Sequence, residues 1–420
     1  MAIPISGPTT ITEPGEYELV NDINGTIEIA SNDVTLNGNG YTVIASSASE
    51  PAIKAYSISN LEVYNVRCIN SKHGIYVSTS SDISIRDSIV QGNSRFGIYI
   101  YYSDNIDMSN ITANNNGLSE NGVGIMVQVT DSCKIDSVFA NANYGGIYVS
   151  ESPNTIITNV TSSENETGIT FFLTKNTCLV SDCILNNNIR GIEILYSNYI
   201  TIKNTTTSYN GYGIEMVSSS YCVIDNLIAN ENTEAGIDIW WNSTDNTIKS
   251  STFINNSSGI LFGYNPGNTL IYNNYFSNNV NVSFYNTNNS YTWNIEKTPG
   301  KNIVGGPYIG GNYWGSPDGT GFSDLAEDSD GDGIADEPYI IDSQNIDYYP
   351  LVKVPEVIEI TLPQIRLAPP SLPPLPKEER VIVEKQVEIR RVPVIPEELF
   401  IYGAVSAGMI PLILALLKRK

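Results

Sequence analysis

The sequence is poor in the residues that most metal sites and nucleic-acid interfaces require. It contains one histidine, five cysteines and five methionines in 420 residues. Its 22 lysines and arginines are outnumbered by 45 aspartates and glutamates, which gives a net charge of −23. Because nucleic-acid phosphates need a basic surface, no nucleic-acid partner is expected. The cysteines and the histidine also lack the spacing of a zinc site.

Leucine is scarce, and no stretch keeps a 3.6-residue period of apolar residues, which argues against leucine-rich repeats and helical arrays. The cysteines do not indicate a disulfide framework either. Cys133, Cys178 and Cys222 recur at one repeat position in alternate repeats. They would lie about 10 Å apart, beyond the reach of a disulfide. We expect them to be small buried apolar residues.

What the sequence does have is a glycine followed by isoleucine, nine times over. The glycines are Gly74, Gly97, Gly124, Gly146, Gly168, Gly191, Gly213, Gly236 and Gly259. Successive glycines are 22 or 23 residues apart, except for one spacing of 27 that predicts a protruding loop near residues 114–121. A period of this length is typical of a stacked solenoid.

Each repeat carries two short runs in which apolar and polar residues alternate, as half-buried strands do. One run follows the glycine and the other lies about eleven residues earlier. Asparagine often precedes the glycine and suits a tight corner, because it tolerates left-handed backbone angles and bonds neighbouring amides. The sequence predicts an all-β fold, a single-stranded, right-handed parallel β-helix of about eleven or twelve coils.

Changes in composition divide the chain into segments. We expect an N-terminal cap with the first coils in residues 1–45, β-helix repeats in 46–295, and a C-terminal cap with an acidic loop in 296–352. Residues 353–397 are rich in proline, which predicts an extended stalk with polyproline II character.

Residues 398–420 predict one transmembrane helix and a basic cytoplasmic tail. The uncharged residues 399–417 would span about 29 Å as a helix, enough for a bilayer core, and Lys-Arg-Lys follows them. We therefore expect the tail inside the cell and the solenoid outside it. A buried core helix is the alternative. The chain begins with Met-Ala-Ile-Pro, which is not an export signal, so we expect that signal to have been removed.

An external location would allow glycosylation at Asn-X-Ser/Thr sequences. Ten candidate asparagines begin such sequences: Asn24, Asn110, Asn159, Asn165, Asn204, Asn242, Asn255, Asn256, Asn281 and Asn288. Many fall at predicted turns, where a glycan could attach. A chain this rich in asparagine, serine and threonine also produces such sequences by chance.

A distinctive block precedes the proline-rich segment. It contains GGNYWGSP at residues 310–317, an acidic run at 328–337 and DYYPL at 347–351. Together with the repeats, this block resembles the NosD-like β-helix family, which is named for periplasmic copper-binding proteins and is common on archaeal cell surfaces. The resemblance covers roughly residues 10–352 and implies a link to copper. Copper prefers imidazole and soft sulfur ligands. Since His73 is the only histidine and is expected in a turn beside Gly74, we do not expect copper.

The acidic run has the pattern of a calcium loop. Asp328, Asp330 and Asp332 hold its first, third and fifth positions, and Gly333 holds the turn. The backbone carbonyl of Ile334 and the side chains of Asp336 and Glu337 are candidates to complete the shell. Position 12 is Tyr339, so the loop is not an EF-hand. We expect a structural Ca²⁺, with a metal-free acidic turn as the alternative.

The residue two after each repeat glycine should point out of the coil. This places Glu193, Glu215 and Asp238 on three successive coils, at about 4.8 Å spacing. Aromatic residues share the same face: Tyr99, Tyr101, Tyr148, Phe172 and Trp240. Such rings could stack on sugars beside carboxyl groups suited to acid-base chemistry. Arg190 is the nearby basic candidate.

Two functions remain open. The solenoid, stalk and anchor predict a membrane-anchored structural or adhesive protein of the cell surface, with polysaccharide or other envelope proteins as its partners. The acidic and aromatic face predicts a protein that binds polysaccharide or cleaves it as a hydrolase or lyase. A solvated face whose tyrosines only stabilise stacked strands is the alternative to both uses of that surface.

Overall fold

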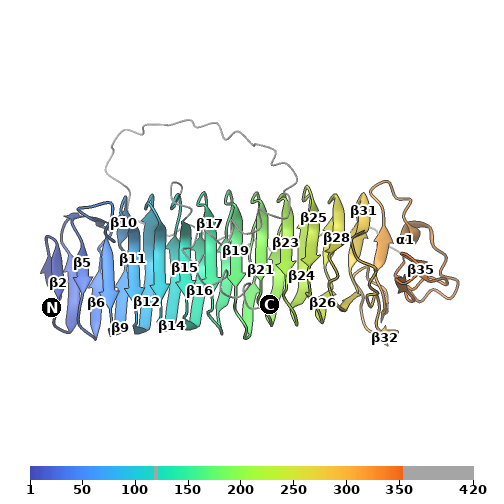
Figure 1. Ribbon diagram of the computed structural model, residues 1–420, viewed down its shortest axis with the longest axis horizontal. Coiled ribbons are helices and arrows are strands. Elements are labelled where there is room, and N and C mark those ends of the chain that lie inside the picture. The colour runs from blue at the N-terminus through green and yellow to red at the C-terminus, as the bar shows by residue number, and fades with distance from the viewer. Residues whose placement is uncertain (118–121, 353–420) are drawn as a thin grey trace, which may run out of the picture. The chain divides into compact units, whose positions relative to one another are not determined.

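The computed structural model describes residues 1–117 and 122–352, and these form a parallel β-solenoid that is elongated along its axis (Figure 1). The predicted stalk and transmembrane helix, residues 353–420, lie outside the described residues, as does part of the predicted loop, 118–121. In the described ranges, no helix is long and apolar enough to cross a membrane. The prediction of an all-β parallel β-helix is confirmed.

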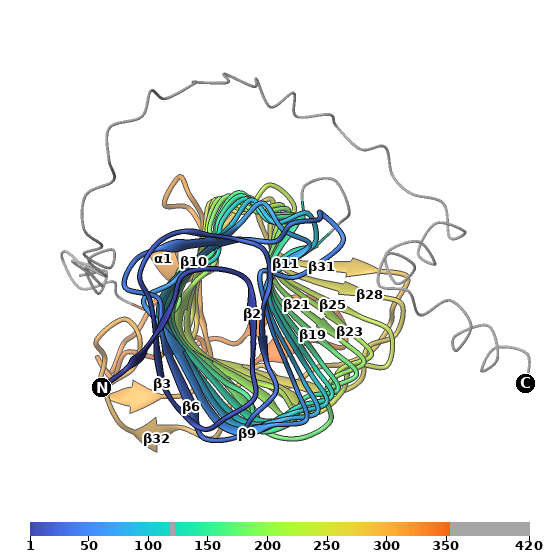
Figure 2. The same ribbon diagram turned by 90° about the vertical axis from the view of Figure 1, so that its left-hand side faces the viewer.

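Two long sheets make the walls of the solenoid (Figure 2). The 13-stranded sheet, called sheet B, comprises β2 (Thr9–Ile11), β5 (Ile27–Ile29), β8 (Ile53–Tyr56), β11 (His73–Ser78), β13 (Phe96–Tyr101), β15 (Val123–Gln128), β17 (Gly145–Ser150), β19 (Thr167–Phe172), β21 (Arg190–Leu195), β23 (Tyr212–Val217), β25 (Ala235–Trp240), β28 (Ser258–Gly263) and β31 (Val280–Tyr285).

The 19-stranded sheet, called sheet A, bends around the rest of each coil. It comprises β1 (Ile3–Ile5), β3 (Gly15–Leu19), β4 (Ile23–Asn24), β6 (Val34–Asn37), β7 (Thr42–Ile44), β9 (Ser59–Tyr64), β10 (Arg67–Ile69), β12 (Ser81–Gln91), β14 (Asp104–Thr112), β16 (Asp131–Phe139), β18 (Ile156–Thr161), β20 (Cys178–Ser181), β22 (Ile200–Thr206), β24 (Val223–Asn230), β26 (Asn246–Lys249), β27 (Thr252–Ile254), β29 (Thr269–Tyr272), β30 (Tyr275–Ser277) and β34 (Tyr313–Gly315).

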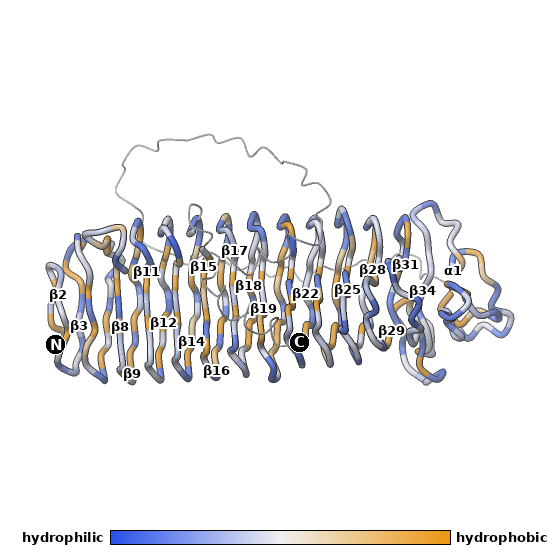
Figure 3. The backbone as a smooth tube through the Cα atoms, viewed as in Figure 1, coloured by the Kyte–Doolittle hydropathy of each residue, from blue (hydrophilic) through white to orange (hydrophobic). Residues whose placement is uncertain are grey.

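The repeated glycine–isoleucine pair lies in sheet B, where each strand pairs in parallel with the next coil. The isoleucine after each glycine is at most 1% exposed, and apolar and polar residues alternate around every coil (Figure 3). Burying one such side chain contributes about 1.5–3 kcal/mol. The glycine is needed because the coils approach closely: a Cβ at Gly97 would lie 2.5 Å from the carbonyl oxygen of Gly124.

An asparagine ladder lines the interior corner before sheet B. Its members are Asn93, Asn116, Asn143, Asn165, Asn188, Asn210, Asn232, Asn256 and Asn278, and each is at most 6% exposed. The backbone N–H of each donates to the side-chain oxygen of the next, at 2.8–3.1 Å. The expectation of amide bonding at this corner is correct, but these asparagines do not have left-handed angles.

Left-handed angles occur at the residue before several of these asparagines, such as Asn187 and Asn255, and at the bend of sheet A. Asp87, Asn110, Asn159 and Asn204 have φ between 48° and 54° there. Their short polar side chains also bond from coil to coil, as in the 2.6 Å bond from Asn110 Nδ2 to Asp87 Oδ1. Asparagine and aspartate tolerate this conformation better than most residues, which accounts for their abundance at the bend.

The two ends of the stack are closed in different ways. At the N-terminal end, β1 and β2 are three-residue strands, and Pro4 lies within β1. Short edge strands that contain proline are poor templates for further pairing. At the other end, β34 adds a strand beside β30, and a terminal block follows with β32 (Thr298–Pro299), β33 (Tyr308–Ile309), α1 (Phe322–Leu325), β35 (Tyr339–Ile340) and β36 (Ile346–Asp347).

Asp347 holds the terminal block on the stack. Its carboxylate accepts hydrogen bonds from the Asn312 backbone N–H at 2.7 Å and from the Trp314 indole at 2.8 Å. Trp314 in turn stacks on Phe276 with 4.9 Å between ring centroids. A Cβ at Gly311 would lie 1.8 Å from the Asp347 carboxylate, so only glycine fits there. The distinctive sequence block is thus an end cap built around one buried acid.

Candidate functional site

Three carboxyl groups form a row on the outer face of sheet B, as the sequence predicted. Glu193 of β21 pairs with Glu215 of β23, which pairs with Asp238 of β25. Neighbouring strands in such a sheet are about 4.8 Å apart. We call these three residues the acidic row.

The acidic row is covered, which the sequence did not predict. The Glu193 side chain is 18% exposed, Glu215 is 7% exposed and Asp238 is 1% exposed. Residues that flank the row on sheet B, Tyr212 and Trp240, interact electrostatically with the same acids. The expectation of a freely solvated acidic face is therefore wrong for Glu215 and Asp238.

Arg190 lies at the centre of this cluster. Its Nε contacts a carboxylate oxygen of Glu215 and lies 3.6 Å from Glu193 Oε1. Its Nη1 lies 3.9 Å from Glu166 Oε1 on the preceding coil. Burial would lower the pKa of Arg190, but Glu215 and Glu193 outweigh it and raise that pKa. One guanidinium group therefore contacts three carboxyl groups.

The two ends of the acidic row bind protons more tightly than ordinary carboxyl groups. Burial raises the pKa of Glu193 to about 7, since Arg190 lowers it only in part and Glu215 raises it further. Burial and the neighbouring Glu215 also raise the pKa of Asp238 well above its usual range. At neutral pH the cluster therefore combines a carboxylate paired with Arg190 and acids that retain protons.

Two buried polar atoms beside the row form no well-aligned hydrogen bond within the described residues, although their groups lie close enough to interact with each other. They are Asp238 Oδ1 and the indole nitrogen of Trp240. The indole lies over Gly263 of the next coil, where a Cβ would come within 3.1 Å of the ring. Buried polar atoms without well-aligned hydrogen bonds are rare in folded proteins and often mark places where a ligand or water binds.

The predicted aromatic residues are brought together only in part. Tyr99 stacks between Tyr76 and Tyr101, at 5.1 and 5.8 Å, and donates a 2.9 Å hydrogen bond to Gln128. Tyr148 lies 6.4 Å from Phe172. Phe172 is only 5% exposed, so the prediction that it offers a free surface for a sugar ring is wrong. Its position on the outer face was correct, but neighbouring side chains cover it.

An aromatic patch that the sequence prediction missed lies at the end of sheet B. It consists of Trp240, Trp241, Tyr264 and Tyr285. The ring centroids of neighbouring members are 5.1–6.4 Å apart, and Tyr285 is 51% exposed. Only Trp240 had been identified from the sequence, because the others follow the strand or lie beyond the last glycine–isoleucine pair.

Large side chains in left-handed conformation follow several strands of sheet B. Immediately after the strands of sheet B, Tyr102, Tyr196, Trp241 and Tyr264 have φ of 48°, 51°, 34° and 54°. This conformation costs about 1–2 kcal/mol for most residues. At the bend of sheet A, comparable positions hold asparagine and aspartate. The same position after sheet B is left-handed in other coils, as at Thr79, Val129 and Ser218, so the conformation belongs to the turn of each coil.

The acidic loop assembles three of its predicted ligands. One carboxylate oxygen each from Asp328, Asp330 and Asp332 lies within 4.8 Å of the others. Lys297 forms an ion pair with Asp332 at this place. The side chain of Asp336 instead accepts hydrogen bonds from Ser329.

The other predicted groups of this loop stay outside the cluster of carboxylates. The Ile334 side chain is buried, so the residue could offer only its backbone carbonyl, and Glu337 is exposed. The geometry thus provides three carboxylates for a cation, held in a loop with left-handed Gly331 and Gly333.

The candidate glycosylation sites fall into two groups. Asn165 and Asn256 are buried members of the asparagine ladder, so the prediction of glycans there is wrong for the folded chain. The other eight are at least partly exposed: Asn24, Asn110, Asn159, Asn204, Asn242, Asn255, Asn281 and Asn288. Several of these, including Asn110 and Asn159, donate their side-chain N–H to an aspartate of the preceding coil.

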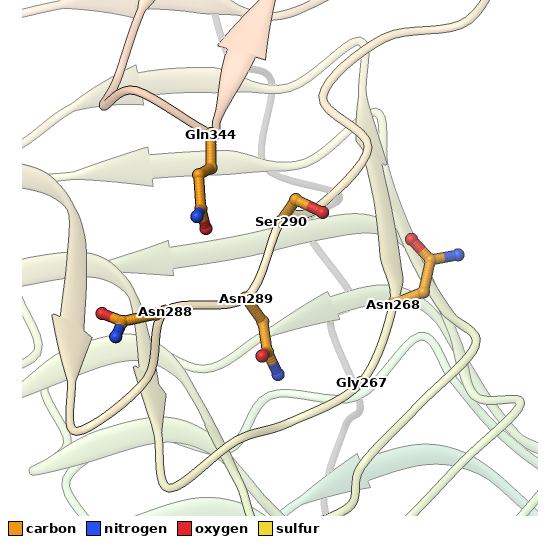
Figure 4. A pocket seen from close by; sticks show the side chains of 6 residues that line it. All are labelled: Gly267, Asn268, Asn288, Asn289, Ser290 and Gln344. Atoms are coloured by element: carbon orange, nitrogen blue, oxygen red, sulfur yellow. The ribbon is translucent and has the colours of Figure 1, made fainter.

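A shallow polar cavity of about 510 Å³ lies where the last coils meet the terminal block (Figure 4). It is lined by Gly267, Asn268, Asn288, Asn289, Ser290 and Gln344. The cavity contains amides and a hydroxyl but no ionisable side chain. It is separate from the acidic row and offers no acid-base chemistry.

A family model now identifies the chain. The model described as periplasmic copper-binding protein (NosD) matches residues 23–172 and 170–319, more than half of the sequence. The chain belongs to the NosD family. The resemblance inferred from the repeats and the terminal block is thereby confirmed. No curated protein sequence matches this NosD-family chain.

Solved structures similar to this NosD-family chain include two modules of Azotobacter vinelandii mannuronan C-5 epimerases. The A-module of AlgE6 is 14% identical, with a TM-score of 0.57, over 67% of this chain and 90% of that one. The A-module of AlgE4 is 16% identical, with a TM-score of 0.53, over 65% of this chain and 87% of that one. At this identity, the likeness shows a shared β-helix fold.

The residues of this NosD-family member do not fit a copper site. His73 was predicted to lie in a turn, and this prediction is wrong. It begins β11, where it is 5% exposed and stacks on Phe96 with 5.1 Å between ring centroids. Burial, with Lys72 and Arg95 nearby, lowers the pKa of His73 to about 3.

The sulfur ligands that copper would prefer are not gathered near this histidine either. All five cysteines are buried and free, as predicted. Burial raises the pKa of Cys178 to about 11 and that of Cys222 to about 12, so neither thiol is poised to ionise. Among the described residues, imidazole and thiolate do not converge on one point, as a copper site requires.

Proposed function

We propose that this NosD-family protein binds a polysaccharide along the outer face of sheet B. The observation that carries the proposal is the covered acidic row around Arg190, flanked by the aromatic patch. Carboxylates accept hydrogen bonds from sugar hydroxyls, and aromatic rings offer flat apolar surfaces for sugar rings. Structural likeness to enzymes that act on mannuronan, a polysaccharide, supports the same class of ligand.

We also propose that the protein works outside the cytoplasm, attached to a membrane. The family description as periplasmic supports an external location. The composition of residues 353–420 supports a stalk and an anchor. On this proposal, the solenoid holds polysaccharide of the envelope near the cell surface. Binding of sugar by sheet B would thus account for the adhesive role. Protease treatment of intact cells should remove the solenoid; if it stays protected, the external location is wrong.

Binding is tested by a glycan array followed by calorimetry with the polysaccharides retained. Trp241→Ala should lower affinity by about tenfold, because stacked aromatic rings commonly contribute more than 1 kcal/mol. Tyr209→Ala is the matched control, since Tyr209 is 54% exposed and lies outside sheet B. The proposal would be overturned if no polysaccharide binds, or if Trp241→Ala and Tyr209→Ala lose affinity equally.

A second candidate function is cleavage of the bound polysaccharide. Adjacent members of the acidic row are spaced by about 4.8 Å, close to the roughly 5 Å between carboxyl groups in retaining glycosidases. Glu193, about half protonated at neutral pH, would donate its proton to the leaving glycosidic oxygen. Glu215 would attack the anomeric carbon, and water would then hydrolyse the glycosyl ester while returning a proton to Glu193.

A reducing-end assay tests this chemistry. The wild-type protein should release new reducing ends, and Glu215→Gln should abolish them with binding largely kept. Glu193→Gln should remove the limb of the pH profile near 7, where Glu193 titrates. If the wild-type protein binds polysaccharide without releasing reducing ends at any pH, the protein is a binding protein and this second candidate is rejected.

A further inference from the structure

The charge of the site restricts the class of polysaccharide that it can accept. In the strands of sheet B from β11 to β31, Arg190 is the only lysine or arginine. It already contacts carboxylates of Glu166, Glu193 and Glu215. It is also the only cation that acts on the pKa of Glu193 or Asp238.

Negative charge is therefore in excess around Arg190. Four carboxyl groups surround it, Glu166, Glu193, Glu215 and Asp238, and Glu234 acts on Asp238 as a fifth. Even with protons retained by Asp238 and in part by Glu193, a ligand carboxylate brought to this covered site would meet the carboxylates of Glu166 and Glu215 and find no free cation. Like charges placed together in a poorly solvated site cost several kcal/mol of binding free energy in general, which Arg190 cannot offset because it is already paired.

What the site does offer matches an uncharged sugar. Asp238 Oδ1 is a buried acceptor and the indole N–H of Trp240 is a buried donor; the two groups interact with each other, and neither atom forms a well-aligned hydrogen bond within the described residues. The aromatic patch begins at the same tryptophan, and Tyr285 in it is half exposed. A sugar hydroxyl can donate to the carboxylate and accept from the indole while its ring contacts the neighbouring aromatic side chains.

We propose that the ligand of this site is an uncharged polysaccharide, and that the acidic cluster around Arg190 excludes polyuronates. This inference rests on the proposed function, since it names the class of ligand that the same face would bind. It also separates this chain from the two mannuronan epimerases that share its fold, because mannuronan is a uronic acid polymer. The shared solenoid would then carry opposite charge selectivity.

The test compares neutral and anionic polysaccharides of matched length in a buffer free of divalent cations. Neutral glucans, mannans and galactans represent the first class, and alginate and polygalacturonate represent the second. We expect at least one neutral polymer to bind at least about tenfold more tightly than either polyuronate. Equal or tighter binding of a polyuronate would overturn the inference and leave the proposed binding function intact.

A charge-removing variant sharpens the test. Glu166→Gln combined with Glu234→Gln removes two flanking carboxylates but keeps the acidic row, including Glu215, the closest partner of Arg190. Affinity for polyuronates should rise by about tenfold, while affinity for the neutral polymer changes little. The control is Asp107→Asn on sheet A, where Asp107 is exposed and pairs with Lys134. Circular dichroism and thermal unfolding confirm that each variant is folded.

The outcomes distinguish the selectivity for uncharged polysaccharides from the binding of polysaccharide itself. An unchanged ratio of neutral to anionic affinity in the double variant would overturn the role of the acids. If no polymer of either class binds, or if binding is unaffected by Trp241→Ala, the proposed function fails and the inference fails with it.

Discussion

The asparagine ladder and the acidic row are built on the same repeat, yet their polar groups are treated in opposite ways. The ladder recurs in consecutive coils, and each side chain is bonded to the next. The acidic row occupies three coils, shares one arginine and leaves buried atoms without well-aligned hydrogen bonds. A column in which every coil has the same residue and every polar group is hydrogen-bonded has a structural role. A column in which neighbouring coils differ, and in which polar atoms lack well-aligned hydrogen bonds, indicates a site.

Breaking the ladder should have the largest effect on stability. Asn188→Ala would leave the backbone N–H of Asn165 and the carbonyl of Ser162 unpaired in the interior. Each such group costs about 1–3 kcal/mol, so we expect a loss of about 2–5 kcal/mol in the free energy of unfolding. Guanidinium unfolding measures it. Asn176→Ala, at an exposed turn, should change stability by less than about 0.5 kcal/mol; similar losses in both would remove the distinction.

The acidic row should respond to pH where the ladder does not. Folding raises the pKa of Glu193 to about 7, so the folded chain binds this proton more tightly than the unfolded chain does. The resulting stabilisation is complete below the pKa of Glu193 in the unfolded chain and is lost as pH rises through 7. Glu193→Gln cannot ionise, so at pH 8 it should be more stable than the wild-type protein by about 1–3 kcal/mol. Near pH 4 the two should agree. Chemical unfolding across this range would contradict the assignment if the difference did not grow with pH.

The loop of Asp328, Asp330 and Asp332 provides a third arrangement, in which Asp330 is exposed, Asp328 and Asp332 are half-buried, and no arginine lies among the carboxylates. Calcium binding there remains a prediction. If it is correct, Ca²⁺ at about 100 times its Kd stabilises the folded chain by about 2.7 kcal/mol. Scanning calorimetry with Ca²⁺ and with a chelator measures the shift, which Asp330→Asn should diminish. A melting temperature indifferent to Ca²⁺ would favour the metal-free acidic turn, with Lys297 as its cation.

A smaller effect is expected where the aromatic patch meets the backbone. Gly263→Ala would place a methyl group 3.1 Å from the Trp240 ring, so the indole must shift by a few tenths of an ångström. We expect a cost of about 1 kcal/mol in stability. The shift should also weaken polysaccharide binding about twofold to tenfold. Trp240 fluorescence reports the movement. If neither the spectrum nor the polysaccharide affinity changes, the Trp240 ring is not part of the binding site.

Much of the fold could be predicted from the sequence because one period repeats it. The Gly-Ile pair places sheet B, and the constant spacing aligns Glu193, Glu215 and Asp238 without any structure. Alternation with period two also decides which residues face the core, so the buried cysteines were predicted correctly.

The covering of the outer face could not be predicted in the same way. Alternation separates the inside of a coil from its outside, but it does not say how large the neighbours on adjacent coils are. Phe172, Asp238 and His73 all face outward or lie at an edge, yet each is at most 5% exposed. The left-handed conformation of Trp241 and Tyr264 was also invisible, because bulky residues rarely adopt it.

The ladder has a consequence for how such molecules change over generations. Each coil presents to the next the same donors and acceptors that it receives from the one before. Loss or duplication of one 22- or 23-residue unit would join two compatible surfaces and leave few groups unmatched. The length of the solenoid can thus change in steps of about 4.8 Å without any change in the coils that carry the acids and aromatic rings.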